Sequence, residues 1–183
     1  MVLKGAQRWL QWTFRREVAN LHRRAFVSRL SARLDRMDGE ASEFALVLVD
    51  IANLAAIQRQ WGAATAQACS AHVANTLNTL AGGRGLTGHL RDNRFALASW
   101  DADTIEHRDD IGRSMIACGL TDYAANPSLP EIEIRVVTGV LNTNGASAKR
   151  MLAHMEYVLF RNDDLSLVSV YRPFMAQYEA SGF

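Results

Sequence analysis

LTGHLRDNRFALASW, residues 86–100, predicts a hairpin in which two apolar strands flank a single charged turn. The turn runs from Arg91 to Arg94 and holds two arginines, an aspartate and an asparagine. A hairpin that only had to turn could use Asn-Gly or Asp-Gly. A loop that holds a phosphate or a metal ion would usually carry glycines and carboxylates. The composition of this turn therefore raises the question of what its side chains contact.

Three further segments predict strands. FALVLVDI (44–51) is a short, β-branched apolar run typical of a buried strand, and EIEIRVVTGVL (131–141) alternates between polar and apolar residues. LSLVSVY (165–171) is the last such segment. Apolar residues at helical spacing predict helices over 3–18, 23–37, 53–62, 63–81, part of 101–122, and 146–161.

This order of elements predicts the fold class. A helical lead-in is followed by the pattern β-α-α-β-β-α-β-α-β, which indicates an α/β (α+β) sandwich with one mixed sheet and helices covering its faces. We divide the chain into a basic amphipathic lead-in helix at 1–20, a single domain at 21–173, and a flexible tail at 174–183.

Charge is distributed unevenly along the chain. The net charge is only +1, which gives no indication of nucleic-acid binding. Residues 1–36, however, carry nine basic side chains against two acidic ones. Trp9 and Trp12 of the lead-in either pack against protein, which we favour, or anchor in a membrane interface. We expect the lead-in helix to mediate self-association into a homo-oligomer.

Several classes of function lack a sequence signal. Cys69 and Cys118 match no metal or redox spacing and are interpreted as core thiols. The five histidines are scattered, and no apolar run approaches the length of a membrane-spanning helix. We therefore expect a cytoplasmic protein without a metal site of its own.

Five short motifs occur in a fixed order along the chain. They are HRRAF (22–26), LVDIANLAAIQRQWG (48–62), RDNRFAL (91–97), VVTGV (136–140) and MEYVLFR (155–161). They resemble, in that order, NRRAF, LLDIDNFKAINDRYG, GGDEFAL, VSIGV and ALYRAK of the GGDEF domain of bacterial diguanylate cyclases. The resemblance covers roughly residues 15–172 and implies the palm-like mixed sheet of that family.

The resemblance implies a metal site that this chain keeps only in part. In active members, divalent metal bridges the triphosphate of GTP and is held by carboxylates from two elements. Asp50 stands at the first of these positions. The second is the third residue of the turn motif, here Asn93, and the fourth is Arg94, where an acid is usual. We therefore expect no catalytic residue, no metal and no cofactor.

Other positions that the resemblance ties to the nucleotide have changed as well. Arg91 and Asp92 replace two glycines that let the backbone approach the nucleotide closely. Gln58 and Gln67 stand where the family contacts guanine with an asparagine and an acid. Arg161 keeps the charge of a lysine that would contact phosphate.

The residues themselves leave several roles open. Asp50 either remains a metal ligand or caps the helix that follows it. Arg91 and Arg94 either contact an anion or a partner, or lie in a solvated hairpin tip. Arg161 either contacts phosphate or complements the dipole of its helix.

The substitutions predict a degenerate GGDEF domain, a catalytically inactive regulatory or scaffolding module in cyclic di-GMP signalling that controls biofilm, exopolysaccharide or motility. A nucleotide sensor is the first alternative, binding GTP or cyclic di-GMP without turnover through Asp50, Gln58, Gln67 and Arg161. An active cyclase with a non-standard motif is the second. The expected partner is a protein of a membrane-associated polysaccharide synthesis, secretion or motility complex, which would place the domain at the periphery of the inner membrane.

Overall fold

The computed structural model of the protein describes residues 21–37, 43–125, 130–142, 147–161 and 168–171. The elements are β1 (Leu21–His22), α2 (Arg23–Arg36), β2 (Glu43–Ile51), α3 (Leu54–Trp61), α4 (Ala63–Ala81), β3 (Gly85–Arg91), β4 (Arg94–Ser99), α5 (Ala102–Glu106), α6 (Arg108–Ala125), β5 (Ile134–Asn142), α7 (Ala148–Arg161) and β6 (Val168–Tyr171). The predicted lead-in helix, with Trp9 and Trp12, and the predicted tail lie outside the described residues.

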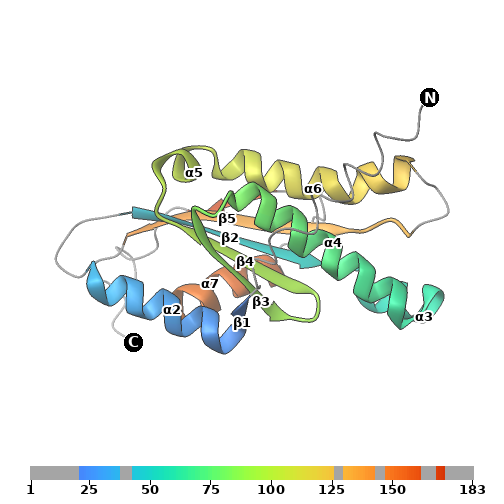
Figure 1. The fold of residues 1–183 in the computed structure, drawn as a ribbon, viewed down its shortest axis with the longest axis horizontal. Helices are drawn as coiled ribbons and strands as arrows, with labels where there is room; N and C mark the ends of the chain where they lie inside the picture. The colour runs from blue at the N-terminus through green and yellow to red at the C-terminus, as the bar shows by residue number, and fades with distance from the viewer. Residues whose placement is uncertain (1–20, 38–42, 126–129, 143–146, 162–167, 172–183) are drawn as a thin grey trace, which may run out of the picture.

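One mixed sheet organises the chain (Figure 1). Its strands lie in the order β1-β3-β4-β2-β5-β6. β2 is central and pairs antiparallel with β4 on one side and with β5 on the other, while β3 and β4 form the predicted hairpin. The outer strands β1 and β6 pair parallel with β3 and β5. The predicted sandwich with a mixed sheet is confirmed.

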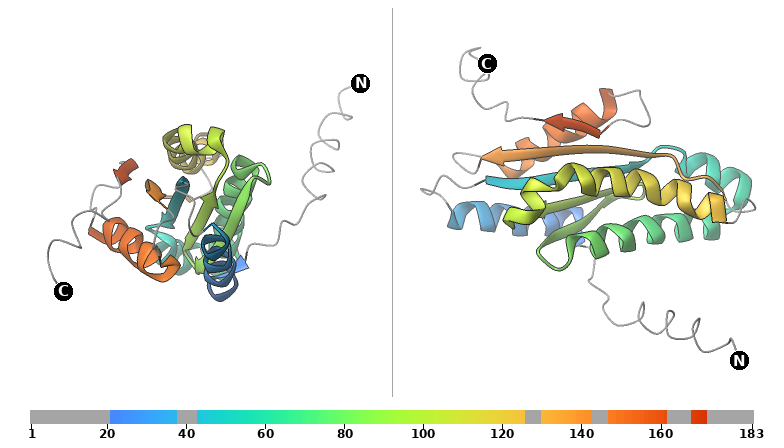
Figure 2. Two further views of the ribbon diagram at one scale, coloured as in Figure 1. Left: turned by 90° about the vertical axis from the view of Figure 1, so that its left-hand side faces the viewer. Right: turned by 90° about the horizontal axis from the view of Figure 1, so that it is seen from above.

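Helices cover both faces of the sheet and enclose two apolar clusters (Figure 2). Odd-numbered residues of β2, such as Val47 and Val49, face α3, α4 and α6. Even-numbered residues, such as Leu46 and Leu48, face α2 and α7. This alternation follows from the period-two geometry of a strand, and burial on both faces explains why β2 is apolar along almost its whole length.

Helix α2 packs closely on strand β3. Phe26 is fully buried, and a Cβ added at Gly88 would lie 2.6 Å from the Phe26 ring. A side chain at residue 88 would therefore push α2 away from the sheet. The glycine fixes the position of α2, and with it the position of Arg23 at the start of that helix.

The structure corrects the sequence prediction at three places. The two-residue strand β1 precedes α2 and was not predicted. The helical part of 101–122 consists of two helices, α5 and α6, separated at His107. Strand β5 starts at Ile134 rather than at residue 131, because Asn53 binds the preceding backbone: its amide donates to the Glu131 carbonyl and its side-chain oxygen accepts from the Glu133 N–H.

Within the described ranges, no helix combines the length and the apolar character that crossing a membrane requires.

Candidate functional site at the end of strand β2

Asp50 lies near the carboxyl end of the central strand, between two arginines. Its register partners are Arg94 on β4 and Arg135 on β5. Residues opposite each other on neighbouring strands project from the same face of the sheet. For Asp50 this is the face covered by α2 and α7. Asp50 is only 5% exposed, so its carboxylate needs partners that replace water.

The turn between β3 and β4 supplies those partners. Arg94 donates to Oδ1 of Asp50 from Nε at 3.1 Å and from Nη2 at 3.0 Å. The Asn93 side-chain amide donates to the same oxygen at 3.0 Å and to the Ile51 carbonyl at 3.3 Å. Three N–H groups therefore converge on one carboxylate oxygen, and one of the donors carries a full positive charge.

A second carboxylate extends this network to the helices. Glu156 of α7 accepts two hydrogen bonds from the Arg23 guanidinium of α2, at 2.6 and 2.9 Å. Arg94 reaches the same carboxylate at 3.5 Å. The charge network, which we define as Asp50, Arg94, Glu156 and Arg23, thus joins β2, β4, α7 and α2 in one alternating chain of charges.

The network keeps Glu156 ionised. Burial is the largest single influence on this carboxyl and by itself would raise its pKa. The hydrogen bond and charge of Arg23, together with the charges of Arg94 and Arg91, outweigh burial and lower the pKa below its ordinary value. In the same pair, the hydrogen bond to Glu156 is the main cause of a raised pKa for Arg23.

Replacing Glu156 by glutamine should lower the free energy of unfolding by about 2 kcal/mol at neutral pH, because two charge-assisted hydrogen bonds lose their charge. A carboxyl whose folded-state pKa is lowered stabilises the protein above its unfolded pKa, and this contribution disappears as the pH falls through the lower folded value. The difference between wild type and Glu156→Gln should therefore shrink on acidification. Urea unfolding at a series of pH values measures this difference. A difference that does not change with pH would contradict a lowered pKa of Glu156 in the folded state.

The tip of the turn is divided between solvent and the interior. Arg91 and Asp92 are exposed, as a solvated hairpin tip would be, whereas Asn93 and Arg94 are turned inward and partly buried. The backbone of the tip is also fixed, because the Ile51 N–H donates to the Asn93 carbonyl at 2.8 Å. Of the alternatives that the sequence left open, a solvated tip therefore describes Arg91 and Asp92 but not Asn93 and Arg94.

The other predicted residues lie apart from this network. Gln58 on α3 and Gln67 on α4 are exposed. Arg161 ends α7, where its Nε donates to the Tyr157 hydroxyl at 2.9 Å and its guanidinium lies 5.4 Å from the centre of the Tyr157 ring. Helix capping by Asp50, an alternative from the sequence, is not observed, since Asn53 occupies the N-cap position of α3.

Sequence reasoning missed Glu156 and Arg23 as members of the site. Both lie inside motifs that were noted, MEYVLFR and HRRAF, but neither had been given a role. One signal for Glu156 was present. It is the one acidic residue of α7 and stands four residues after Leu152 and three before Leu159, both buried. A carboxylate at that spacing faces the sheet and needs a cationic partner.

Fold and sequence now define the class of protein. The model of the family "Diguanylate cyclase, GGDEF domain" matches residues 18–162. The chain belongs to the GGDEF family.

Solved structures share the fold at low sequence identity. The GGDEF domain of DgcB from Caulobacter crescentus, in complex with c-di-GMP, is 15% identical with a TM-score of 0.64, and the match covers 86% of this chain and 97% of that one. The GGDEF domain of TpbB (YfiN) from Pseudomonas aeruginosa is 14% identical with a TM-score of 0.68, covering 88% and 95%. An active GGEEF domain of a diguanylate cyclase from Vibrio cholerae is 15% identical with a TM-score of 0.63, covering 83% and 97%. No curated protein is significantly similar in sequence.

The residues around Asp50 do not fit the divalent metal that the family implies. A hard cation requires several oxygen ligands, with carboxylates from more than one element. Asp50 is the one carboxylate here that stands at a family ligand position, and its Oδ1 already accepts from Arg94 and Asn93. Across the described residues, no three His, Cys, Asp or Glu side chains converge to hold a metal.

Proposed function

We propose that this chain is a catalytically inactive GGDEF domain that acts as a regulatory or scaffolding protein-interaction module in cyclic di-GMP signalling. One observation carries the proposal. The Arg94 guanidinium forms an ion pair with the Asp50 carboxylate. In active relatives, the carboxylate at this position would bind the metal. A guanidinium group that is part of the protein cannot bridge the phosphates of GTP as a metal ion does. The ion pair therefore supports the fold but not the cyclase reaction.

The network also supports a scaffolding role. It ties both helices of one sheet face to the central strands, at Arg23 and at Glu156. The charges that an enzyme would direct at its substrate are used here to hold α2 and α7 in place. Such a domain presents a fixed surface to a protein partner. A component of a membrane-associated polysaccharide synthesis, secretion or motility complex is the kind of partner we propose, with the lead-in helix as the self-association element.

The proposal is tested by incubating the purified chain with GTP and either Mg²⁺ or Mn²⁺ and separating the nucleotides by chromatography. We expect unchanged GTP and no cyclic di-GMP under conditions in which the Vibrio cholerae GGEEF domain, as positive control, converts its substrate. Formation of cyclic di-GMP by the wild type, abolished by Asp50→Asn, would overturn the proposal.

A nucleotide sensor is the second candidate function. The observation that favours it is the exposure of Gln58 and Gln67 on α3 and α4, where amide groups remain available to a guanine edge. Calorimetric titration with GTP and with cyclic di-GMP in the absence of divalent metal distinguishes a nucleotide sensor from a module that binds only protein. Heat of binding that disappears in a Gln58→Ala/Gln67→Ala variant supports the sensor function. The absence of heat with both nucleotides excludes it.

A further inference from the structure

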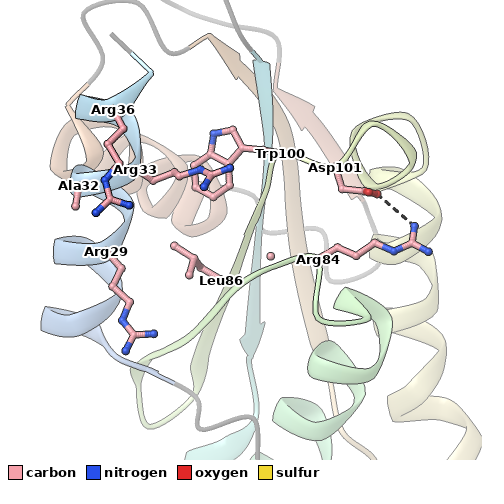
Figure 3. A pocket seen from close by; sticks show the side chains of 9 residues that line it. Arg29, Ala32, Arg33, Arg36, Arg84, Leu86, Trp100 and Asp101 are labelled. Atoms are coloured by element: carbon pink, nitrogen blue, oxygen red, sulfur yellow. Dashed lines mark hydrogen bonds and ion pairs between the residues drawn. The ribbon is translucent and has the colours of Figure 1, made fainter.

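Helix α2 presents a row of arginines, none of which forms an ion pair with another described residue, to a groove on the sheet face that the helix covers. Arg29, Arg33 and Arg36 line this groove, together with Leu86 of β3 and Trp100 after β4 (Figure 3). Arg84 lies on the opposite side, with its guanidinium turned toward Asp101 at 3.4 Å. We call the space between these walls the arginine groove. Its volume of about 510 Å³ lies in the range of ligand-binding clefts.

The arginines of α2 share one face of the helix because their spacing is i, i+4 and i+7. At the rise of an α-helix they span about 10 Å. All three are exposed, and no carboxylate in the described part of the chain lies within ion-pair distance of any of them. The one acid of α2, Asp35, lines a different depression, beside Lys149 of α7. Among the described residues, the one carboxylate that lines the groove is Asp101, which pairs with Arg84 on the opposite wall, so the row on α2 has no ion-pair partner there.

Trp100 gives the groove an apolar floor. The Arg33 guanidinium lies 5.3 Å from the centre of the indole ring, and Phe44 stacks on the same ring at 5.2 Å. Two side chains thus already cover the indole, which leaves little ring surface on which a nucleobase could stack. The stacking also holds Arg33 in an extended position across the groove. Leu86, partly buried, continues the floor beside Trp100.

From this arrangement we propose that the arginine groove is the docking surface for an acidic polypeptide segment of a partner protein. Charge complementarity selects the occupant, because a row of guanidinium groups pairs with successive carboxylates by bidentate hydrogen bonds. Leu86, which is only partly buried, adds a place for one apolar side chain of the segment. A flat anionic membrane fits less well, since the arginines line a concave space with a second wall rather than a convex face. This inference rests on the proposed role as a protein-interaction module and names its surface.

The test uses the full chain and a fluorescein-labelled peptide, Glu-Glu-Leu-Glu-Glu-Leu-Glu-Glu, followed by fluorescence anisotropy. The matched control peptide has glutamine in place of every glutamate. We expect binding of the acidic peptide that weakens as salt is added, and no binding of the control peptide. The variant Arg29→Glu/Arg33→Glu/Arg36→Glu should bind the acidic peptide about tenfold or more weakly.

A charge-matched variant separates the groove from general electrostatics. Arg24→Glu/Arg59→Glu/Arg150→Glu changes the net charge by the same amount at exposed arginines outside the groove and should bind within about twofold of wild type. Circular dichroism establishes that both variants fold.

Equal weakening in both variants, absence of peptide binding, or tighter binding to phosphatidylglycerol vesicles or to a single-stranded oligonucleotide than to the peptide would overturn the inference. None of these outcomes bears on GTP turnover, and turnover of GTP would not contradict peptide binding in the arginine groove. Failure of this inference and failure of the proposed function are therefore distinguishable.

Discussion

Arg94→Ala is expected to lower the free energy of unfolding by about 3 kcal/mol, because it removes the one cation that contacts both carboxylates of the charge network. The side chains of Asp50 and Glu156 are 8% and 13% exposed, so water cannot readily replace the guanidinium. Among the described residues, the Asn93 amide would then be the one side chain that still donates a hydrogen bond to Asp50. A buried carboxylate with such incomplete compensation costs far more than a lost surface ion pair.

The control for this prediction is three residues away in the same turn. The Arg91 side chain is exposed and makes no hydrogen bond or ion pair with the described residues, so Arg91→Ala should change the free energy of unfolding by no more than about 0.5 kcal/mol. Urea unfolding of the three proteins, followed by tryptophan fluorescence and circular dichroism, gives both values. If Arg94→Ala were as stable as Arg91→Ala, the network would not hold the site together.

Phe26→Ala should lower the free energy of unfolding by about 3 to 5 kcal/mol, the range for removing a fully buried phenylalanine. The ring packs over Gly88, where no other side chain of β3 can fill the space, so a cavity remains between α2 and the sheet. Because α2 also carries Arg23 and the arginine groove, its loosening should weaken the Arg23–Glu156 pair as well.

Arg24, an exposed residue two positions before Phe26, provides the comparison. Arg24→Ala should leave the free energy of unfolding within about 0.5 kcal/mol of wild type, since the side chain is solvent-exposed on the same helix. Urea unfolding, followed by circular dichroism, measures both variants. A loss of less than about 1 kcal/mol in Phe26→Ala would contradict the close packing of α2 on β3.

Local chemistry explains which parts of the fold were predictable from the sequence. Helix α4 matches its predicted range of 63–81, because glycines with positive φ flank it at both ends, Gly62 at +87° and Gly82 at +57°. The central strand was equally clear from its β-branched run. By contrast, β1 is only two residues long, too short for any periodicity to indicate it.

The candidate site was predictable only in part, because its members are distant in the chain. The resemblance pointed to Asp50, Asn93 and Arg94, and strand register brings these three together. The pair of Arg23 and Glu156 spans 133 residues, and no pattern in a single sequence links two such positions. Their contact depends on how α2 and α7 pack on the sheet, which is decided by burial rather than by spacing.

Electron paramagnetic resonance of Mn²⁺ in the presence of the protein tests most directly whether an internal arginine has taken the place of the metal. The aqueous ion gives a strong signal that decreases when it binds to protein ligands. GTP itself binds Mn²⁺, so each sample is compared with the same solution without protein. We predict that adding the wild-type chain up to millimolar concentration leaves the signal of free Mn²⁺ at the value of that reference, with and without GTP, because Arg94 and Asn93 hold the Asp50 carboxylate. A decrease in the free signal that is lost in Asp50→Asn would show a working metal site and contradict this account.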